Sequence, residues 1–207
     1  MVTTPPGIDG DAFQAAQTLV TTRQNVSAKR LLEPGPSLPE LDALLRLAAA
    51  APDHGQLTPW RFILVPVEQR HRLAEAFSQA LLDRDAGATQ EQVQAARDKA
   101  HRAPMLLVAV ARLGAREPDI PALERMVSLG AAIQNMLLGA HALGYATGLT
   151  SGQAMASPRL HALLALADGD HPVCCINIGT VHRHRAATRV RPVPTEFAGT
   201  LGQAGAA

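Results

Sequence analysis

No Asp, Glu, Lys or Arg occurs between residues 126 and 158, and this uncharged stretch constrains the fold of the chain most strongly. A segment so poor in charge is buried, either in a bilayer or in the core of a globular protein. Polar side chains and glycines interrupt it, among them Gln134, Asn135 and His141. These interruptions favour a buried helix over a membrane span. The pattern predicts a helix over 121–143 that ends at Gly144, because glycine readily follows a helix C-terminus.

The composition excludes several classes of protein. Hydrophobic residues make up 47% of the 207 residues and charged residues 18%, which is typical of a globular chain. Lys and Arg number 19 against 18 Asp and Glu, so there is no global field to hold nucleic acid or an anionic membrane. Aromatic residues are only 3%, which disfavours stacking on nucleic acid bases. We expect neither nucleic acid nor a membrane as a partner.

Cysteine usage and the N-terminus indicate a reducing compartment. Cys174 and Cys175 are adjacent in an apolar run, and neighbouring side chains of a strand point to opposite faces. This spacing excludes a disulfide framework. Residues 1–7 lack both the basic and the apolar region of a secretory signal. These features predict a cytoplasmic protein with reduced thiols.

Common catalytic and binding motifs are absent from the chain. It contains no dinucleotide-binding glycine motif, no P-loop, no HExxH, no CxxC and no nucleophile elbow. His182 and His184 stand one residue apart between arginines, whose charge opposes a cation. We therefore expect no metal site.

The pattern of apolar and capping residues predicts intermixed helices and strands. Helices are expected over 11–22, from the capping box at 37–40 to Pro52, around 73–81, from a second capping box at 89–92 to before Pro104, and over 121–143 and 157–167. Strands are expected over 61–65, 105–111, 145–150 and 173–181. Linkers are few and short, which predicts a single domain over 1–207 with tails at about 1–10 and 192–207. The fold class is α+β or α/β.

Three polar segments stand out between these elements. Residues 23–30 form a donor-rich loop that suits a phosphate, and a solvated loop is the alternative. Residues 51–60 join Asp53 and His54 to a Pro-Trp step, where a helix stop followed by a turn explains the prolines but not the polar cluster. Residues 148–152 form a small-residue loop that lets backbone N–H groups approach a planar ligand, or a simple turn.

Together the three segments resemble the nitroreductase superfamily, specifically its minimal-length FMN-dependent NAD(P)H nitroreductase subgroup. The resemblance runs from about Leu19 to Thr180, and its most specific part is Ala51-Pro-Asp-His54 with Pro59-Trp60 behind it. Further matching segments follow in the expected order, namely Leu31–Pro34, Arg102–Pro104, Ser128–Gly130, Gly144-Tyr145, Thr150–Gly152 and Ile178–Thr180.

The resemblance implies an α+β fold, an α/β sandwich whose central, mixed and mainly antiparallel sheet is flanked by helices. It also implies an intertwined homodimer with FMN at the interface. The uncharged helix is then the central dimer helix, and small residues would allow close helix approach, namely Gly130, Ala131, Ala132, Gly139 and Ala140.

The resemblance also implies the cofactor-binding residues. Arg23 with Asn25 would bind the 5′-phosphate of FMN, and Gln24 or Ser27 would donate to its pyrimidine edge. His54 would come from the other subunit. Leu149, Thr150 and Ser151 would lie against the flavin, and residues 139–144 align with a segment associated with NAD(P)H. No catalytic side chain is implied, because N5 of the flavin carries the hydride.

The implied activity is that of an NAD(P)H oxidoreductase. Electrons would pass in ping-pong order from NAD(P)H to FMN and then to a nitroaromatic, a quinone or a similar small-molecule acceptor. A flavin-binding carrier or sensor with little turnover is the alternative. Other chemistry with reduced flavin, such as dehalogenation, would need a substrate lid from 84–101 or 113–121.

The chain departs from the pattern of the family at its arginines. The family loop is commonly Arg-Arg-Ser, where this chain has Arg23-Gln24-Asn25, and a Trp-Arg-Ser is replaced by residues 149–151. An arginine that precedes the Ala-Pro-Asp-His in the subgroup is Ala50 here. The candidate substitutes lie in the C-terminal tail, namely Arg183, Arg185, Arg189 and Arg191, for which a solvated basic tail is the alternative reading.

Overall fold

Four antiparallel strands form one sheet in the computed structural model, which describes residues 10–114, 119–183 and 190–202. The sheet has the order β1-β2-β4-β3. Its strands are β1 Trp60–Leu64, β2 Met105–Arg112, β3 Ala146–Thr150 and β4 Asp170–Gly179. Every ladder between named strands is antiparallel, and the one parallel pairing within the described ranges is an isolated bridge from Asn25 to Thr147.

Strand β2 is buried on both faces of the sheet. One set of its side chains packs with the first hydrophobic cluster, namely Met105, Leu107, Ala109 and Ala111. The alternate set packs with a second cluster, namely Leu106, Val108 and Val110. Cys174 and Cys175 divide between the two clusters in the same way and both are free thiols, as the sequence predicted. A strand with two apolar faces needs helices on both sides of the sheet.

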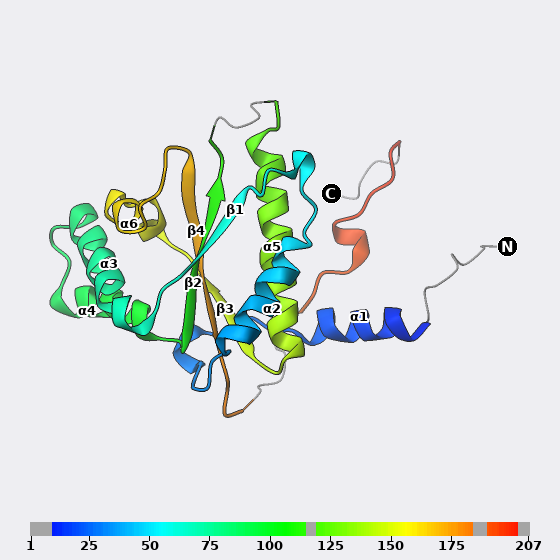
Figure 1. Ribbon diagram of the computed structural model, residues 1–207, viewed down its shortest axis with the longest axis horizontal. Coiled ribbons are helices and arrows are strands. Elements are labelled where there is room, and N and C mark those ends of the chain that lie inside the picture. Colours follow the sequence, from blue (N-terminus) through cyan, green and yellow to red (C-terminus); the bar gives the residue numbers. More distant parts are fainter. Residues whose placement is uncertain (1–9, 115–118, 184–189, 203–207) are drawn as a thin grey trace.

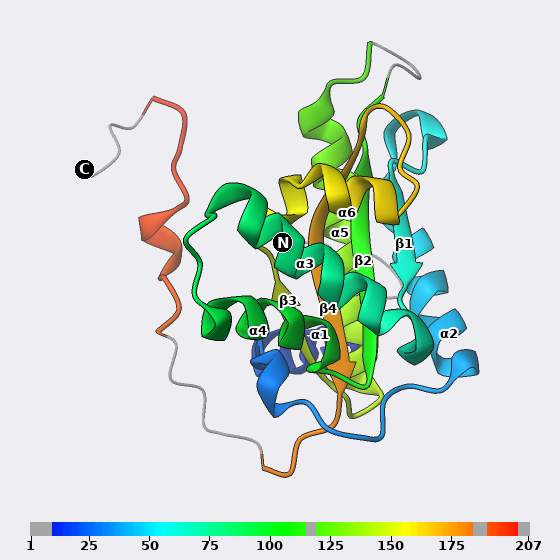
Figure 2. The ribbon, with the colours of Figure 1, turned by 90° about the vertical axis from the view of Figure 1, so that its left-hand side faces the viewer.

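Helices cover both faces (Figures 1 and 2). On one face lie α2 Leu38–Ala49 and α5 Ala122–Ala142, and on the other α3 Arg70–Arg84, α4 Gln90–Asp98 and α6 Pro158–Leu163. Short 3-10 helices connect these elements, namely η1 Ala28–Arg30, η2 His54–Gln56, η3 Val67–Gln69, η4 Lys99–His101, η5 Gln153–Ala156 and η6 Pro194–Glu196. No helix in the described ranges is long and apolar enough to cross a membrane. The α+β sandwich expected from the resemblance is therefore present.

Most element boundaries agree with the prediction from sequence, and the two capping boxes are confirmed at Ser37 and Thr89. Several element ends differ by a few residues, such as α4, which ends at Asp98 and continues only as the 3-10 helix η4, and two of the differences have a clear local cause. Helix α6 stops at Leu163 and not at residue 167, because Ala165 adopts a left-handed conformation with φ 47°. Strand β4 begins at Asp170, three residues before the predicted start, because it pairs with β2 beyond a register shift at Ala109 and Val110.

Helix α5 packs on α2 through a close approach at Gly139. A Cβ at this position would overlap Leu47 and come within 2.9 Å of Leu44. Ala132 and Ala140 are fully buried within the chain as well. Three of the five small residues expected to face a partner helix thus serve packing inside the chain, and that part of the expectation is wrong. Of the five, Gly130 is exposed, and it shares the outward face of α5 with Leu123 and Val127.

The loop after α1 (Gly10–Thr22) is held against the edge strand β3 by a second close approach. A Cβ at Gly148 would overlap the carbonyl oxygen of Val26, so only glycine permits this distance. The N–H of Val26 donates to the carbonyl of Thr147 at 2.8 Å, and the N–H of Leu149 donates to Oδ1 of Asn25 at 2.9 Å. Together these contacts fix residues 23–27 along β3.

A buried arginine ties the start of α3 to the entrance of β2. The Arg70 side chain is 3% exposed, and its guanidinium donates to four backbone carbonyls, those of Val65, Ala100, Ala103 and Pro104, at 2.8 to 3.1 Å. A buried cation is tolerated when its donors are satisfied in this way.

Replacement of Arg70 by Met should lower the free energy of unfolding by about 3 kcal/mol, because it leaves buried carbonyl groups without donors. Urea denaturation of the two proteins measures this difference. The matched control is Arg72→Met on the exposed side of the same helix, which should change stability little. Equal stability of R70M and R72M would contradict the assignment.

Replacement of Gly148 by Ala should displace residues 23–27 from β3. We expect a loss of about 2 kcal/mol in stability from the overlap with Val26. The amide protons of Val26 and Leu149 should exchange faster in hydrogen-exchange measurements. Gly87→Ala is the control, since a Cβ there meets no atom closer than 3.4 Å. Unchanged exchange at both amides in G148A would show that the close approach does not hold the loop.

Candidate functional site

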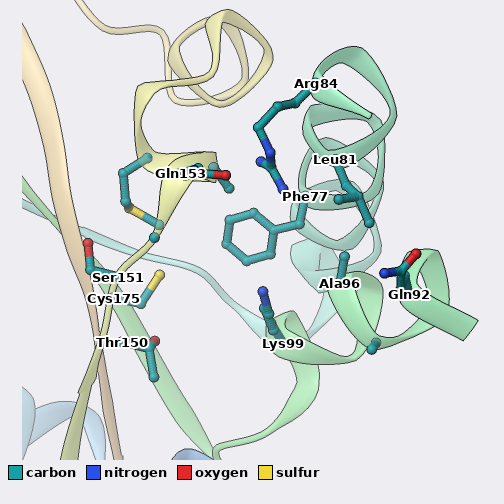
Figure 3. A pocket seen from close by; sticks show the side chains of 14 residues that line it. Phe77, Leu81, Arg84, Gln92, Ala96, Lys99, Thr150, Ser151, Gln153 and Cys175 are labelled. Carbon is teal, nitrogen blue, oxygen red and sulfur yellow. The ribbon is translucent and has the colours of Figure 1, made fainter. Parts of the chain in front are cut away.

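A cavity of about 400 Å³ opens between α3, α4, η5, the end of β3 and the middle of β4 (Figure 3). Phe77, from the buried face of α3, lies at its centre, and Thr150 and Ser151 approach from the end of β3. The remaining walls include Arg84, Gln92, Lys99, Gln153, Met155 and Cys175. A concave site of this size with an aromatic ring and a few polar groups is typical of a small-molecule site.

The described charged side chains that line the cavity are all basic. Arg84 and Lys99 reach it from α3 and from the segment after α4, and no Asp or Glu is among the described residues that line it. Such a site attracts an anion or a group that gains negative charge during a reaction.

Cys175 lies in the wall of the cavity but is not an activated nucleophile. Burial raises the pKa of its thiol to about 12, and burial also raises the pKa of Cys174, on the opposite face of the sheet, to about 11. Both sulfurs are therefore protonated at neutral pH. Asn177 holds the nearby end of β3 in place, because its Nδ2 donates to the Gly148 carbonyl and to Oγ1 of Thr150 at 3.0 Å.

The second part of the site is a small, basic hollow at the opposite end of β3. Arg23, Gln24 and Arg30 line it together with His141 and Tyr145. The hydroxyl oxygen of Thr22, the residue before Arg23, lies 2.9 Å from Nε2 of His141. The hollow therefore joins the loop to the C-terminal end of α5.

Tyr145 is fixed at the wall of this hollow by a carboxylate. Its hydroxyl donates to Glu40 at 3.1 Å, and Glu40 also accepts the capping hydrogen bonds of Ser37. Hydrogen bonds from Ser37, with a smaller contribution from Tyr145, lower the pKa of Glu40. Burial, with the neighbouring carboxylate, raises the pKa of Tyr145. Glu40 is thus ionised and Tyr145 neutral at neutral pH, which keeps this hydrogen bond intact.

The C-terminal segment returns to the same loop. The guanidinium of Arg191 donates to the carbonyl of Thr21 at 3.0 Å, and Arg30 donates to the carbonyl of Arg183 at 3.2 Å. Arg185 and Arg189 lie outside the described residues. Of the four arginines considered as substitutes for missing loop cations, the structure therefore brings Arg191 within two residues of Arg23.

The cavity and the hollow are joined by one strand. Thr147 in the hollow and Ser151 in the cavity are four residues apart along β3, about 13 Å at the rise of a strand. Leu149 lies between them and binds Asn25 through its backbone. Ser27 precedes η1 and is among the lining residues of neither space.

His54 is not part of this arrangement within one chain. Its Nδ1 lies 2.7 Å from Oε2 of Glu124, in the first turn of α5. His141, which lines the hollow, is 17 residues further along the same helix, about 25 Å away at 1.5 Å per residue. The structure thus separates His54 from the other residues predicted from the sequence.

Several residues of the cavity were not predicted from the sequence. Phe77 is a core position of an amphipathic helix, and Arg84 in the last turn of α3 is explained by the helix dipole. Lys99 and Gln92 are exposed polar positions like many others. No local signal distinguishes these four, because only the packing of α3 and α4 beside η5 brings them together.

Comparison with known proteins places the chain in a family. The sequence profile described as "Nitroreductase family" matches residues 23–180. A Haemophilus influenzae protein named "Putative NAD(P)H nitroreductase" is 33% identical over 165 residues, which cover 80% of this chain and 88% of that protein. The Escherichia coli protein YdjA, which carries the same name, is 30% identical over 185 residues, covering 89% of this chain and 98% of its own length.

Solved structures show the same fold. A nitroreductase-like family protein from Bacillus cereus has a TM-score of 0.76 at 20% identity, covering 98% of this chain and 100% of that one. A single-substitution variant of NfnB, an FMN- and NADPH-dependent nitroreductase of a Sphingopyxis strain, has a TM-score of 0.69 at 17% identity, covering 91% and 99%. From the family match and these relatives, the chain belongs to the nitroreductase family.

Proposed function

We propose that the protein is an FMN-dependent NAD(P)H oxidoreductase that reduces a nitroaromatic, a quinone or a similar small acceptor. The observation that carries the proposal is that the described residues lining the cavity at one end of β3 include only basic charged side chains and that a second set of cations lies at the other end. The names of the relatives, NAD(P)H nitroreductases, agree with it.

The residues present fit a flavin mononucleotide. Lys99 and Ser151 would hold the ring system in the cavity, and Arg23 with Arg191 would hold the phosphate at the loop. Gly148 keeps that loop close to β3, so both groups of donors lie along one strand. Lys99 would also offset the negative charge that a flavin gains on reduction. In this assignment Lys99 replaces Gln24 or Ser27 as the donor near the pyrimidine edge.

The overall reaction needs no nucleophile from the protein. When bound, FMN supplies the two-electron chemistry by taking a hydride from NAD(P)H and passing the electrons to the acceptor. For a nitro compound the balance is NAD(P)H + H⁺ + ArNO₂ → NAD(P)⁺ + ArNO + H₂O. The protonated thiol of Cys175 agrees with this assignment, because it cannot compete for an electrophilic acceptor.

We further propose a homodimer with two flavin sites at its interface. No residue of helix α1 is buried within its own chain, and its Phe13 is 68% exposed. The helix projects from the body on the side of α5 (Figure 1). Leu123 and Val127 on α5 are 80% and 71% exposed. A second copy that covers this apolar side would stabilise α1, since an isolated short helix is marginal in water. It would also bring the His54 of one protomer to the site of its partner.

The purified protein should show the two visible absorption bands of a flavin, and anaerobic NADPH should bleach them. Adding a quinone should restore the bands. The absorption spectrum before and after each addition measures this directly. A protein that shows no bands even with added FMN would refute the cofactor assignment. Bands that persist with both NADPH and NADH would favour the carrier or sensor.

Replacement of Val127 by Asp should yield a monomer that has lost flavin, because a carboxylate would be buried in the proposed interface. Sedimentation velocity and flavin absorbance measure the two effects. The matched control is Val67→Asp, since Val67 is 69% exposed but lies in η3. A wild-type monomer, or a V127D protein that remains a flavin-loaded dimer, would contradict the dimer proposal.

A further inference from the structure

Arg84 is a cation aimed into the cavity. It occupies the last turn of α3, and its guanidinium points away from the helix toward the ring of Phe77, opposite Lys99 (Figure 3). Gln153 approaches the same space from η5. The helix dipole explains a cation in this turn, but it does not explain the orientation into the cavity.

The two acidic residues that flank Arg84 in the sequence accept hydrogen bonds from other groups. Asp83 forms a double hydrogen bond with Arg159, and Oδ1 of Asp85 accepts from the N–H of Gly87 at 3.0 Å. Within the described parts of the chain, the side chain of Arg84 forms no ion pair and no hydrogen bond, whereas several other arginines bind carboxylates. The guanidinium is thus available to a ligand.

The cavity around Arg84 suits an aromatic ligand with an anionic group. Phe77 is 5% exposed and presents a fixed ring, and Leu81, Ala96 and Met155 extend the apolar wall. A planar ring can stack there, and the forked guanidinium can bind a carboxylate with two parallel hydrogen bonds. The Arg84 side chain is itself exposed to solvent, so its selectivity for a carboxylate rests on the paired geometry of the two hydrogen bonds and not on exclusion of water.

We propose that Arg84 selects acceptors that carry a carboxylate on an aromatic ring. The inference rests on the proposed function and names the substrate class of the same site. Lys99 is assigned to the flavin, so Arg84 is the cation that remains for the acceptor. In this role Arg84 is a specificity-determining residue, and neutral acceptors still react.

The test compares two ligands that differ in charge but hardly in shape, para-nitrobenzoate and para-nitrobenzamide. Dissociation constants are measured by calorimetry on the oxidised protein without NAD(P)H, and kcat/KM for both compounds is measured with NADPH. The variants are Arg84→Gln and the control Arg72→Gln, which removes the same charge from the exposed side of the same helix.

The wild type and R72Q should bind the carboxylate about tenfold more tightly than the amide. R84Q should lose this preference with little change for the amide, and the ratio of kcat/KM values should follow. Equal affinities in the wild type, or an undiminished preference in R84Q, would overturn the proposal. A change in NADPH against NADH discrimination with the acceptor preference intact would also overturn it, because Arg84 would then recognise the 2′-phosphate of the donor.

The binding arm separates this inference from the proposed function. If NAD(P)H fails to bleach the flavin, the proposed activity is refuted, while the calorimetric preference still decides the role of Arg84. If the flavin bleaches and the acceptor preference is absent, the activity stands and the role of Arg84 is refuted.

Discussion

Burial of β2 on both faces is the constraint on which the rest of the structure depends. Its alternate side chains enter two separate hydrophobic clusters, so neither face of the sheet can be left to solvent. Residues of α2 and α5 pack in the cluster on one face, and residues of α3 and α6 pack in the cluster on the other. The strand order then leaves β3 at an edge, where its outer side is free to pair with the loop after α1. The candidate site occupies the two ends of this edge strand.

The two ends of β3 differ because different layers meet there. At one end, α5 and the loop at 23–30 form a narrow basic hollow that Tyr145 and Glu40 frame with a charge-assisted hydrogen bond. At the other end, α3 and α4 stand away from β3, and the larger cavity opens with Phe77 at its centre. Because no described carboxylate lines the cavity, no cavity side chain neutralises Arg84 or Lys99, and both charges are available to a ligand. The flavin assignment and the acceptor preference of Arg84 both follow from this difference.

Much of the fold followed from local pattern. The two capping boxes, the strand at β2 and the end of α5 at Gly144 were predicted, since each depends on neighbours within a few residues. The small residues of α5 were misassigned in part, because periodicity cannot say whether an apolar face meets its own chain or a partner. The Arg23–Asn25 loop was recognised from a resemblance in sequence. Its attachment to β3 through Gly148 involves residues more than a hundred positions away.

The sequence alone determined that helices and strands intermix and that the cysteines are unpaired, and the resemblance carried by its ordered motifs gave the α+β fold and the family. Periodicity, composition and motifs suffice for this because they are local along the chain. Tertiary structure alone decided where the charges meet. It brought Arg84 and Lys99 into one cavity with Ser151, and it set His54 at the far end of α5 from the Arg23 loop. The reason is physical: a side chain acquires its electrostatic environment from the elements around it, and the cavity lies between α3 and α4 on one side and the end of β3 on the other, which are far apart in the sequence.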